Sequence, residues 1–261
     1  MKEIQIRKND AGQRLDRFVG KAVPLLPESL LQKYIRLKRI KRNGKGAKRD
    51  VRLVEGDVLQ LYINDEFFER PTEENAWLKI ATPRLDIVYE DENILLADKK
   101  PGVLCHSAGE WSWDTLISNI QAYLRQSGEW DPKAENAFTP ALCNRIDRNT
   151  GGIVIAAKNA EALRILNDKI RDREIDKAYL CVVCGRPKPA EGRLEGYLFK
   201  DAVKNQVYVT KKPQPGAKSA ATEYRTLQSR KGLSLVECRL LTGRTHQIRA
   251  QMAAAGCPLL G

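Results

Sequence analysis

Residues 143–157 carry the sequence CNRIDRNTGGIVIAA, in which a polar loop leads directly into a strand of five apolar residues. The carboxylate of Asp147 lies between Arg145 and Arg148, and nearby positive charge favours the anionic form of a carboxylate. Two successive glycines precede the strand, which indicates a close approach of the backbone to a site. The stretch therefore predicts a polar site at the start of a buried strand, although an ion-paired surface loop is the commoner meaning of such a pattern.

Two other segments place polar side chains beside predicted strands. Residues 177–179, KAY, open one strand. A single tyrosine at the start of a strand, as Tyr179 is, usually packs half-buried against its neighbours. At residues 240–249, LLTGRTHQIR, a strand passes through glycine into a predicted helix whose free amide groups could bind a phosphate or a carboxylate. His246 could act as a general base, but with His106 as the second of two histidines no metal triad or Ser-His-Asp set can be assembled. We expect a structural or orienting role for both histidines.

The spacing of apolar residues along the rest of the chain predicts an α+β fold. Alternating residues predict strands at 86–89, 94–98, 153–157, 179–185, 206–210, 222–228 and 234–241. Helical spacing predicts helices at 113–126, 159–172 and 244–255. These elements favour a mixed, largely antiparallel sheet.

The N-terminal residues predict a separate small α/β domain. The pattern gives a strand at 4–6, helices at 14–23 and 28–40, a turn at Asn43-Gly44 and a hairpin-like pair of strands at 51–54 and 58–63. Residues 64–82 are acidic and aperiodic, which predicts a linker. A chain of 261 residues with 42% hydrophobic content can form two cores. We therefore predict domains at residues 1–63 and 83–261.

The positive charge of the chain is concentrated at one end. The net charge is +12, and residues 1–60 hold 16 Lys or Arg against 7 Asp or Glu. Between residues 33 and 49 there are nine basic residues and no acidic one, so a solvated helix face is the weaker interpretation. We predict that this region binds phosphates, through the side chains of Lys33, Arg36, Arg39, Lys41 and Arg42.

The cysteines and the apolar runs exclude several other classes of protein. Six scattered cysteines in a chain of this size predict reduced thiols, and the Cys181-x-x-Cys184 pair lies in a predicted strand with no second pair to complete a zinc site. No signal peptide is visible, and the apolar runs are too short to span a bilayer. We expect a soluble cytoplasmic protein, and the sequence contains no metal ligand set or nucleotide-binding loop.

The motifs resemble those of the RluA-type pseudouridine synthases. Residues 144–152, NRIDRNTGG, are similar to the His-Arg-Leu-Asp-x-x-Thr-Ser-Gly signature of that family, with Asn144 in place of histidine and Gly151 in place of serine. Tyr179 matches the tyrosine of the second motif, and residues 241–249 match the third. Residues 89–102 resemble the opening hairpin of the family, so the similarity extends over residues 85–261. Residues 4–63 resemble the small S-four-like (alpha-L) RNA-binding fold, a common companion of this family.

The resemblance implies a reaction and a set of roles. Members of the family break the N-glycosidic bond of a uridine, rotate the base and join its carbon 5 to the ribose, without ATP, metal or redox cofactor. By the same resemblance, Asp147 is the nucleophile or the base, Arg249 is its ion-pair partner and Tyr179 stacks on the uracil. Arg145 fills the space left by the flipped nucleotide, and Leu241 forms part of an apolar wall. The third motif also places Arg244 and His246 among the substrate-binding residues.

The sequence leaves other functions open. The chain could be an inactive RNA-binding or ribosome-assembly protein, or a glycosidase-like hydrolase, which would ordinarily need paired carboxylates. Because of the basic N-terminal domain we favour ribosomal RNA over transfer RNA as the partner, and we expect a monomer. Residues 257–261 stand where family members generally continue through further strands, so we expect the catalytic domain to be incomplete at that end.

Overall fold

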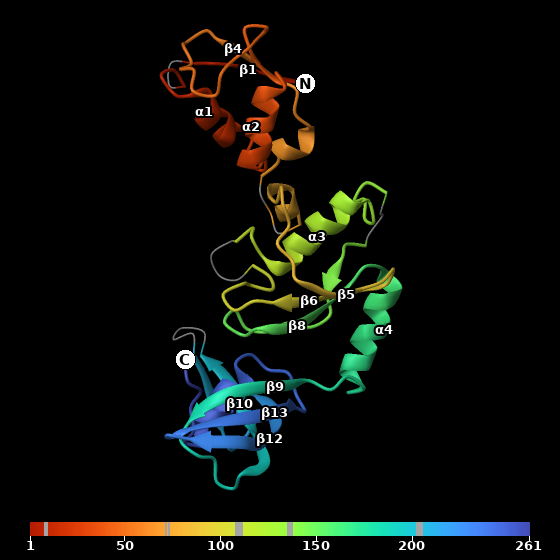
Figure 1. Cartoon of the computed structure of the whole chain (residues 1–261), viewed down its shortest axis with the longest axis vertical. Coiled ribbons are helices and arrows are strands. Elements are labelled where there is room, and N and C mark those ends of the chain that lie inside the picture. Colours follow the sequence, from red (N-terminus) through yellow and green to blue (C-terminus); the bar gives the residue numbers. More distant parts are fainter. Residues whose placement is uncertain (8–9, 71, 73, 108–111, 135–137, 202–205) are drawn as a thin grey trace. The chain divides into compact units, whose positions relative to one another are not determined.

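The computed structural model describes residues 1–7, 10–70, 72, 74–107, 112–134, 138–201 and 206–261. Pro71 and Glu73 of the predicted linker lie outside the described residues. The chain consists of two compact units, Met1–Arg164 and Ile165–Gly261. Figure 1 shows the helices and strands of both units, with the sequence coloured from red to blue.

The first unit begins with a small sheet and two helices. The strands β1 (Lys2–Gln5), β2 (Ile40–Arg42), β3 (Lys45–Gly46) and β4 (Val58–Leu61) form the order β1-β4-β2-β3. The helices α1 (Leu15–Ala22) and α2 (Glu28–Arg36) contribute buried apolar side chains to one core with this sheet. The predicted turn at Asn43-Gly44 is confirmed, because both residues have positive φ angles, 52° and 78°, and they join β2 to β3.

The predicted pairing of residues 51–54 with 58–63 is wrong. Strand β4 pairs with β1 and β2 instead, and Arg52 makes an isolated bridge to Arg14. The buried carboxylate of Asp57 explains the difference, since it accepts hydrogen bonds from the Val54 amide and the Asn43 side chain, both at 2.8 Å. These contacts direct the chain after residue 57 to β2.

Residues 64–82 contain two short 3-10 helices, η1 (Asp65–Phe68) and η2 (Ala76–Lys79). Phe67 of η1 is buried in the core of the small sheet. Trp77 of η2 packs edge to face against Trp130, with ring centroids 5.4 Å apart. Parts of this segment are therefore ordered against neighbouring elements, and the domain bounds 1–63 and 83–261 stay a prediction.

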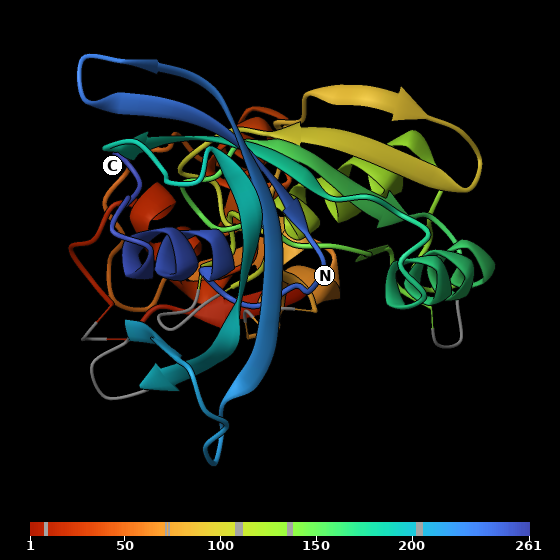
Figure 2. The same cartoon turned by 90° about the horizontal axis from the view of Figure 1, so that it is seen from below.

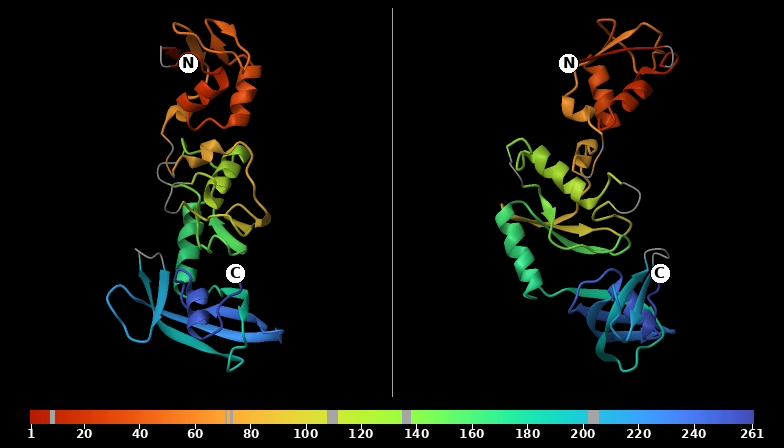
Figure 3. Two further views of the ribbon diagram at one scale, coloured as in Figure 1. Left: turned by 90° about the vertical axis from the view of Figure 1, so that its left-hand side faces the viewer. Right: turned by 180° about the vertical axis from the view of Figure 1, so that it is seen from behind.

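The second sheet of this unit carries the motif of residues 143–152. Its strands are β5 (Ile87–Glu90), β6 (Ile94–Lys99), β7 (Ala141–Leu142) and β8 (Gly152–Ala157), in the order β5-β6-β8-β7. Helix α3 (Leu116–Ser127) lies against one face of the sheet in Figure 3. Val154 and Ala156 of β8 are fully buried, whereas Ile153 is exposed, so the predicted buried strand is buried on one face. Helix α4 (Ala160–Arg171) follows β8 and contains the boundary between the two units.

The second unit is a five-stranded antiparallel sheet with one helix. Its strands are β9 (Ala178–Cys184), β10 (Glu191–Asp201), β11 (Gln206–Thr210), β12 (Lys218–Arg230) and β13 (Leu233–Leu240), in the order β11-β10-β12-β13-β9. Figure 2 shows the long twisted strands in teal and blue. Helix α5 (Gln247–Ala254) contributes Met252 to a core with Val183, Val236 and Cys238. The sequence did not predict β10, because Gly192 and Gly196 interrupt its apolar alternation.

The predicted α+β class is confirmed. The strand pairings reported for the described residues are antiparallel, and they form three sheets. Within the described ranges, no helix is both long enough and apolar enough to cross a membrane.

Candidate active site

The loop that carries Asp147 connects β7 to β8. Strand β7 pairs with β8 at Leu142 and Ala156, and the Cys143 amide donates to the Ile155 carbonyl at 2.8 Å. The main chain then leaves the sheet and turns back, with the Thr150 amide donating to the Asp147 carbonyl at 3.1 Å. Asp147 is half-buried at this turn, while Arg145 is exposed. The strand that follows gives this short loop a rigid support.

The peptide groups on both sides of Asp147 are anchored by hydrogen bonds. The carbonyl of Ile146 accepts a contact from the Cys105 thiol at 3.4 Å. The carbonyl of Arg148 accepts from the Gly102 amide at 2.8 Å, and the Arg148 side chain donates to the Gly102 carbonyl at 3.1 Å. These anchors restrain the backbone from which the Asp147 carboxylate extends.

The buried side chain of Lys99 also holds the Asp147 loop. Lys99 is 1% exposed, and its Nζ donates to the carbonyls of Lys100, Val103 and Arg148 at 3.1, 2.9 and 3.0 Å. Three carbonyls match the three donors of an ammonium group. Burial lowers the pKa of Lys99, and the negative charge of Asp147 acts in the opposite direction.

Lys99 was missed as a site residue at the sequence level. The available signal is its position in β6, where Leu95, Ala97 and Lys99 are the inward residues of an alternating strand. A lysine at an inward position is costly unless its charge is satisfied, so it marks a polar site below the sheet. Gly151 gives a second signal, since a Cβ there would lie 3.2 Å from the Pro101 ring. The backbone at Gly151 therefore packs closely against Pro101, while its approach to a bound substrate stays a prediction.

The third motif forms the connection between β13 and α5 in the second unit. The buried side chain of Gln247 organises it by accepting from the Thr242 hydroxyl at 2.8 Å and from the Arg244 amide at 3.0 Å. Its Nε2 donates to the Ala221 carbonyl at 3.0 Å and to the Thr222 hydroxyl at 2.9 Å. Gln247 was not predicted as a site residue, and nothing in its spacing distinguishes it from a surface glutamine.

The remaining predicted residues of the second unit lie on this connection or on the neighbouring strand. Tyr179 is half-buried in β9, opposite Cys238 of β13. Leu241 and His246 are half-buried, and the Arg244 side chain donates to the Ser219 carbonyl at 3.1 Å. Arg249 is exposed on α5 and donates to the Gly261 carbonyl at 2.7 Å.

The predicted site residues are thus divided between the two units. The structure brings Asp147 and Arg145 together in one loop of Met1–Arg164. The other five, Tyr179, Leu241, Arg244, His246 and Arg249, belong to Ile165–Gly261. The ion pair of Asp147 with Arg249 and the stacking of Tyr179 on a base stay predictions.

A family model described as RNA pseudouridylate synthase matches residues 93–254. The match includes the Asp147 loop, Tyr179 and the connection from β13 to α5. The chain belongs to the RNA pseudouridylate synthase family. It is an RNA pseudouridine synthase, which is an isomerase, so the predicted family and enzyme class are confirmed.

Curated members of the family match nearly the whole chain. An uncharacterised RNA pseudouridine synthase of Mycoplasma genitalium is 33% identical over 260 residues, which cover 98% of this chain and 79% of that protein. The ribosomal large subunit pseudouridine synthase C of Rickettsia bellii is 31% identical, over 95% of this chain and 81% of its own length. Among solved structures, human RNA pseudouridylate synthase domain containing 4 is 22% identical and covers 67% of this chain and 66% of its own, with a TM-score of 0.52. This likeness confirms the predicted pseudouridine synthase fold.

In the small N-terminal sheet and its helices, the five predicted phosphate-binding residues differ in their surroundings. Lys33, Arg36 and Arg39 are exposed, and Lys41 lies with its Nζ 5.2 Å from the centre of the Tyr62 ring. Arg42 instead forms an ion pair of 2.6 Å with the buried carboxylate of Asp57. Burial alone would raise the pKa of Asp57, but the hydrogen bonds from Arg42, Val54 and Asn43 lower it. Arg42 therefore has a buried acidic partner, whereas the guanidinium of Arg39 lies 5.2 Å from the centre of the Tyr34 ring.

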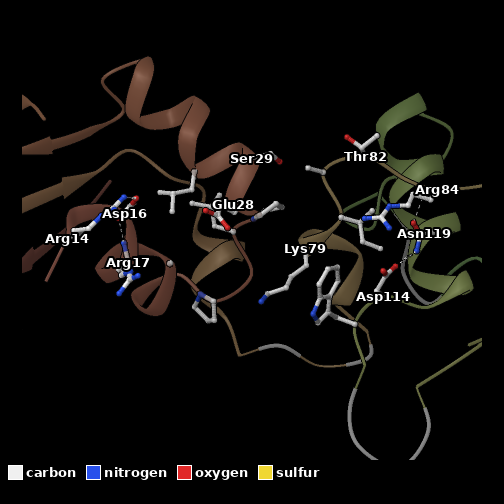
Figure 4. A pocket seen from close by; sticks show the side chains of 18 residues that line it. Arg14, Asp16, Arg17, Glu28, Ser29, Lys79, Thr82, Arg84, Asp114 and Asn119 are labelled. Atoms are coloured by element: carbon white, nitrogen blue, oxygen red, sulfur yellow. Dashed lines mark hydrogen bonds and ion pairs between the residues drawn. The ribbon is translucent and has the colours of Figure 1, made fainter. Parts of the chain in front are cut away.

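None of the predicted catalytic residues is a cysteine or lines the cavity described for this chain. All six cysteines are free thiols, and burial raises the pKa of Cys143 to about 11. Among the residues the structure describes, no group of three or more His, Cys, Asp or Glu could hold a metal ion. The pocket in Figure 4 is lined by residues such as Arg17, Lys79 and Asp114, and none of the predicted catalytic residues lines it.

Proposed function

We propose that this pseudouridine synthase modifies specific uridines of ribosomal RNA, with the carboxylate of Asp147 acting at the ribose of the flipped nucleotide. The observation that carries this proposal is the fixed backbone around Asp147, whose neighbours on both sides have anchored carbonyls. A carboxylate that attacks or deprotonates a sugar must be held in reach of one carbon atom, and fixed geometry supplies much of the rate. Both the nucleophile and the base role are compatible with this geometry.

The other predicted residues receive roles from their placement. Arg145 is exposed beside Asp147, which suits a guanidinium that enters the space left by a flipped base. Tyr179 is half-buried, so one face of its ring could stack on the uracil. Arg249 is proposed as the ion-pair partner of Asp147. The half-buried Leu241, Arg244 and His246 would complete the walls of the substrate site.

The choice of ribosomal RNA rests on relatives and on charge. The relatives from Rickettsia bellii and Neisseria meningitidis are named ribosomal large subunit pseudouridine synthases C and D. The exposed residues Lys33, Arg36 and Arg39 give the proposed S-four-like domain a surface for phosphates. We further propose that the protein acts as a monomer in the cytoplasm, where ribosomal RNA is made in bacteria.

The target is tested by carbodiimide mapping of pseudouridine in total RNA from cells with and without the gene. The proposal expects one or more signals in ribosomal RNA that disappear with the gene. Loss of signals confined to transfer RNA would contradict the ribosomal assignment. Release of free uracil by the purified protein, without pseudouridine, would instead indicate a hydrolase.

The basic surface is tested through the salt dependence of RNA binding. Replacing Arg36 and Arg39 together by Gln should lower the slope of log affinity against log salt by about 1–2, since each phosphate contact contributes about 0.7–0.9. The matched control replaces Lys169 and Arg171 of α4, two exposed basic residues that pair with neighbouring acids. Equal slopes for the two double variants would remove the basic surface from RNA binding.

A further inference from the structure

The main-chain groups at the edge of β8 bond to the main chain of β7 as far as Cys143, and to the side chain of Asn144 where the Asp147 loop begins. Leu142 pairs with Ala156 in the regular ladder, and the Cys143 amide still donates to the Ile155 carbonyl at 2.8 Å. A hydrogen-bonded antiparallel pair normally exchanges two bonds, so the Ile155 amide would ordinarily donate to the Cys143 carbonyl. In this chain the side chain of Asn144 takes that bond, with its Oδ1 accepting from the Ile155 amide at 2.8 Å.

The same side chain also satisfies the next free group on β8. The Nδ2 of Asn144 donates to the Ile153 carbonyl at 3.3 Å. Its carboxamide therefore offers an acceptor and a donor to β8, as a peptide group of a paired strand would. The main chain at residues 144 and 145 is released from the ladder without leaving these groups of β8 unpaired.

We propose that Asn144 is a positioning residue whose carboxamide replaces a peptide group at the edge of β8 and thereby fixes where the Asp147 loop leaves the sheet. Lys99 and Gly102 hold the far side of Asp147 through the Arg148 carbonyl, at 3.0 and 2.8 Å. Asn144 supplies the anchor on the near side, three residues before the carboxylate. This role rests on the proposed function of Asp147.

The role makes a specific demand on the chemistry of residue 144. The side chain must present one acceptor and one donor at the same time, which a carboxamide does at every pH. A neutral imidazole also has one donor and one acceptor, so the histidine of the resembled signature could serve in the same way. A carboxylate has acceptors alone and would face the Ile153 carbonyl with a lone pair.

The first test compares Asn144→Ala and Asn144→Asp with wild type in single-turnover assays with enzyme in excess. We expect the rate to fall about 10- to 100-fold, because a displacement of a catalytic group by about 1 Å has an effect of this size. RNA affinity should stay within about twofold, since Asn144 acts through the loop and not on the RNA backbone. The assays are run well below the melting temperature of each variant.

Asn159→Ala is the matched control for lost stability. The Asn159 side chain also bonds through both of its polar atoms, accepting from the Ala162 amide at 2.9 Å and donating to the Asn93 side chain at 2.9 Å and the Glu92 carbonyl at 3.5 Å. It lies at the start of α4, outside the site. Its loss should lower the melting temperature yet leave the single-turnover rate unchanged.

The pH dependence of the rate of Asn144→His distinguishes the proposed role from a purely structural one. Its rate should approach wild type above the imidazole pKa of about 6.5 and fall below that pH, because an imidazolium has two donors and no acceptor. Wild type should lack this step. Rates within about twofold of wild type for Asn144→Ala and Asn144→Asp would overturn the proposal, as would an Asn144→His variant as slow as Asn144→Ala at every pH. A fully active Asp147→Asn would instead overturn the proposed function itself.

Discussion

The Asp147 loop and the connection from β13 to α5 are both held by one buried polar side chain, but the chemistry differs. Lys99 presents a charged ammonium to three carbonyls, and the charge of Asp147 acts on it. Gln247 presents a neutral amide that donates twice and accepts twice. A buried charge depends on every partner around it, whereas a neutral amide tolerates the loss of one. The loop with the anion should therefore be the more fragile of the two.

The largest effect is expected for Lys99→Met. The change removes the ammonium with a side chain one atom shorter, and three hydrogen bonds to carbonyls are lost. The Arg148 and Lys100 carbonyls keep the amides of Gly102 and Val103 as donors, whereas the Val103 carbonyl loses its Lys99 donor. Relief of the desolvation of the ammonium offsets part of the loss. We expect the free energy of unfolding to fall by about 2–4 kcal/mol and turnover to be lost. Urea unfolding and a single-turnover assay measure the two quantities.

Lys100→Met is the matched control for that change. Lys100 pairs with Asp86 and Asp98 on the surface, and its side chain is 60% exposed. Such pairs contribute about 0–1 kcal/mol, so this variant should be nearly normal. If the two lysine variants behaved alike, the comparison between a charged and a neutral anchor would fail.

A smaller effect is expected for Gln247→Ala. Four hydrogen bonds are lost, but water can replace part of them in the half-buried connection, so we expect a loss of about 1–3 kcal/mol and a reduced turnover. Gln251→Ala is the control, because Gln251 is equally buried one turn later and bonds to Thr222, Leu194 and Ala220. If the Gln247 and Gln251 variants had similar melting temperatures but different turnover, the effect of Gln247 on the connection would be distinguished from its effect on the stability of the core.

The order of fragility has a direct check. If Gln247→Ala lowered the free energy of unfolding more than Lys99→Met did, the neutral side chain of Gln247 would contribute more to stability than the charged side chain of Lys99, against the expected order. Equal loss of turnover in the Gln247 and Gln251 variants would reduce Gln247 to a packing residue.

The smallest effect on stability is expected for Tyr179→Phe. The ring that could stack on a base is retained and the hydroxyl is removed, so folding and RNA affinity should be near normal while turnover slows. Steady-state rates and melting temperature provide the measurement. Turnover equal to that of wild type would leave the Tyr179 hydroxyl without a role in the reaction.

The sequence predicted the parts of the fold that local patterns determine. Strand β8 and the loop before it follow from an apolar run after paired glycines, and the Asn43-Gly44 turn follows from backbone preference. Strand β10 was missed, because Gly192 packs beneath the Tyr224 ring and contributes no apolar side chain to the pattern. The pairing of residues 51–54 was wrong, because the bonds of Asp57 join residues that are far apart in the sequence.

The site was predicted less completely than the fold. The sequence motifs pointed to Asp147, Tyr179 and Arg249, which stay predictions as catalytic residues. The anchors Lys99 and Gln247 were missed, since the role of a buried polar side chain depends on carbonyls and hydroxyls that tertiary structure brings to it. Asn144 was visible only as a departure from the resembled signature.

The central claim is that the carboxylate of Asp147 performs the chemistry, and Asp147→Asn tests it most directly. The change keeps size and hydrogen-bonding shape and removes the charge. The measurement is tritium release from RNA labelled at carbon 5 of uridine, with enzyme in excess, alongside the melting temperature and the RNA affinity. The account predicts a folded protein that binds RNA and releases no detectable tritium. Release within a fewfold of wild type would contradict it, because a surface ion pair worth about 0–1 kcal/mol would then explain the residue equally well.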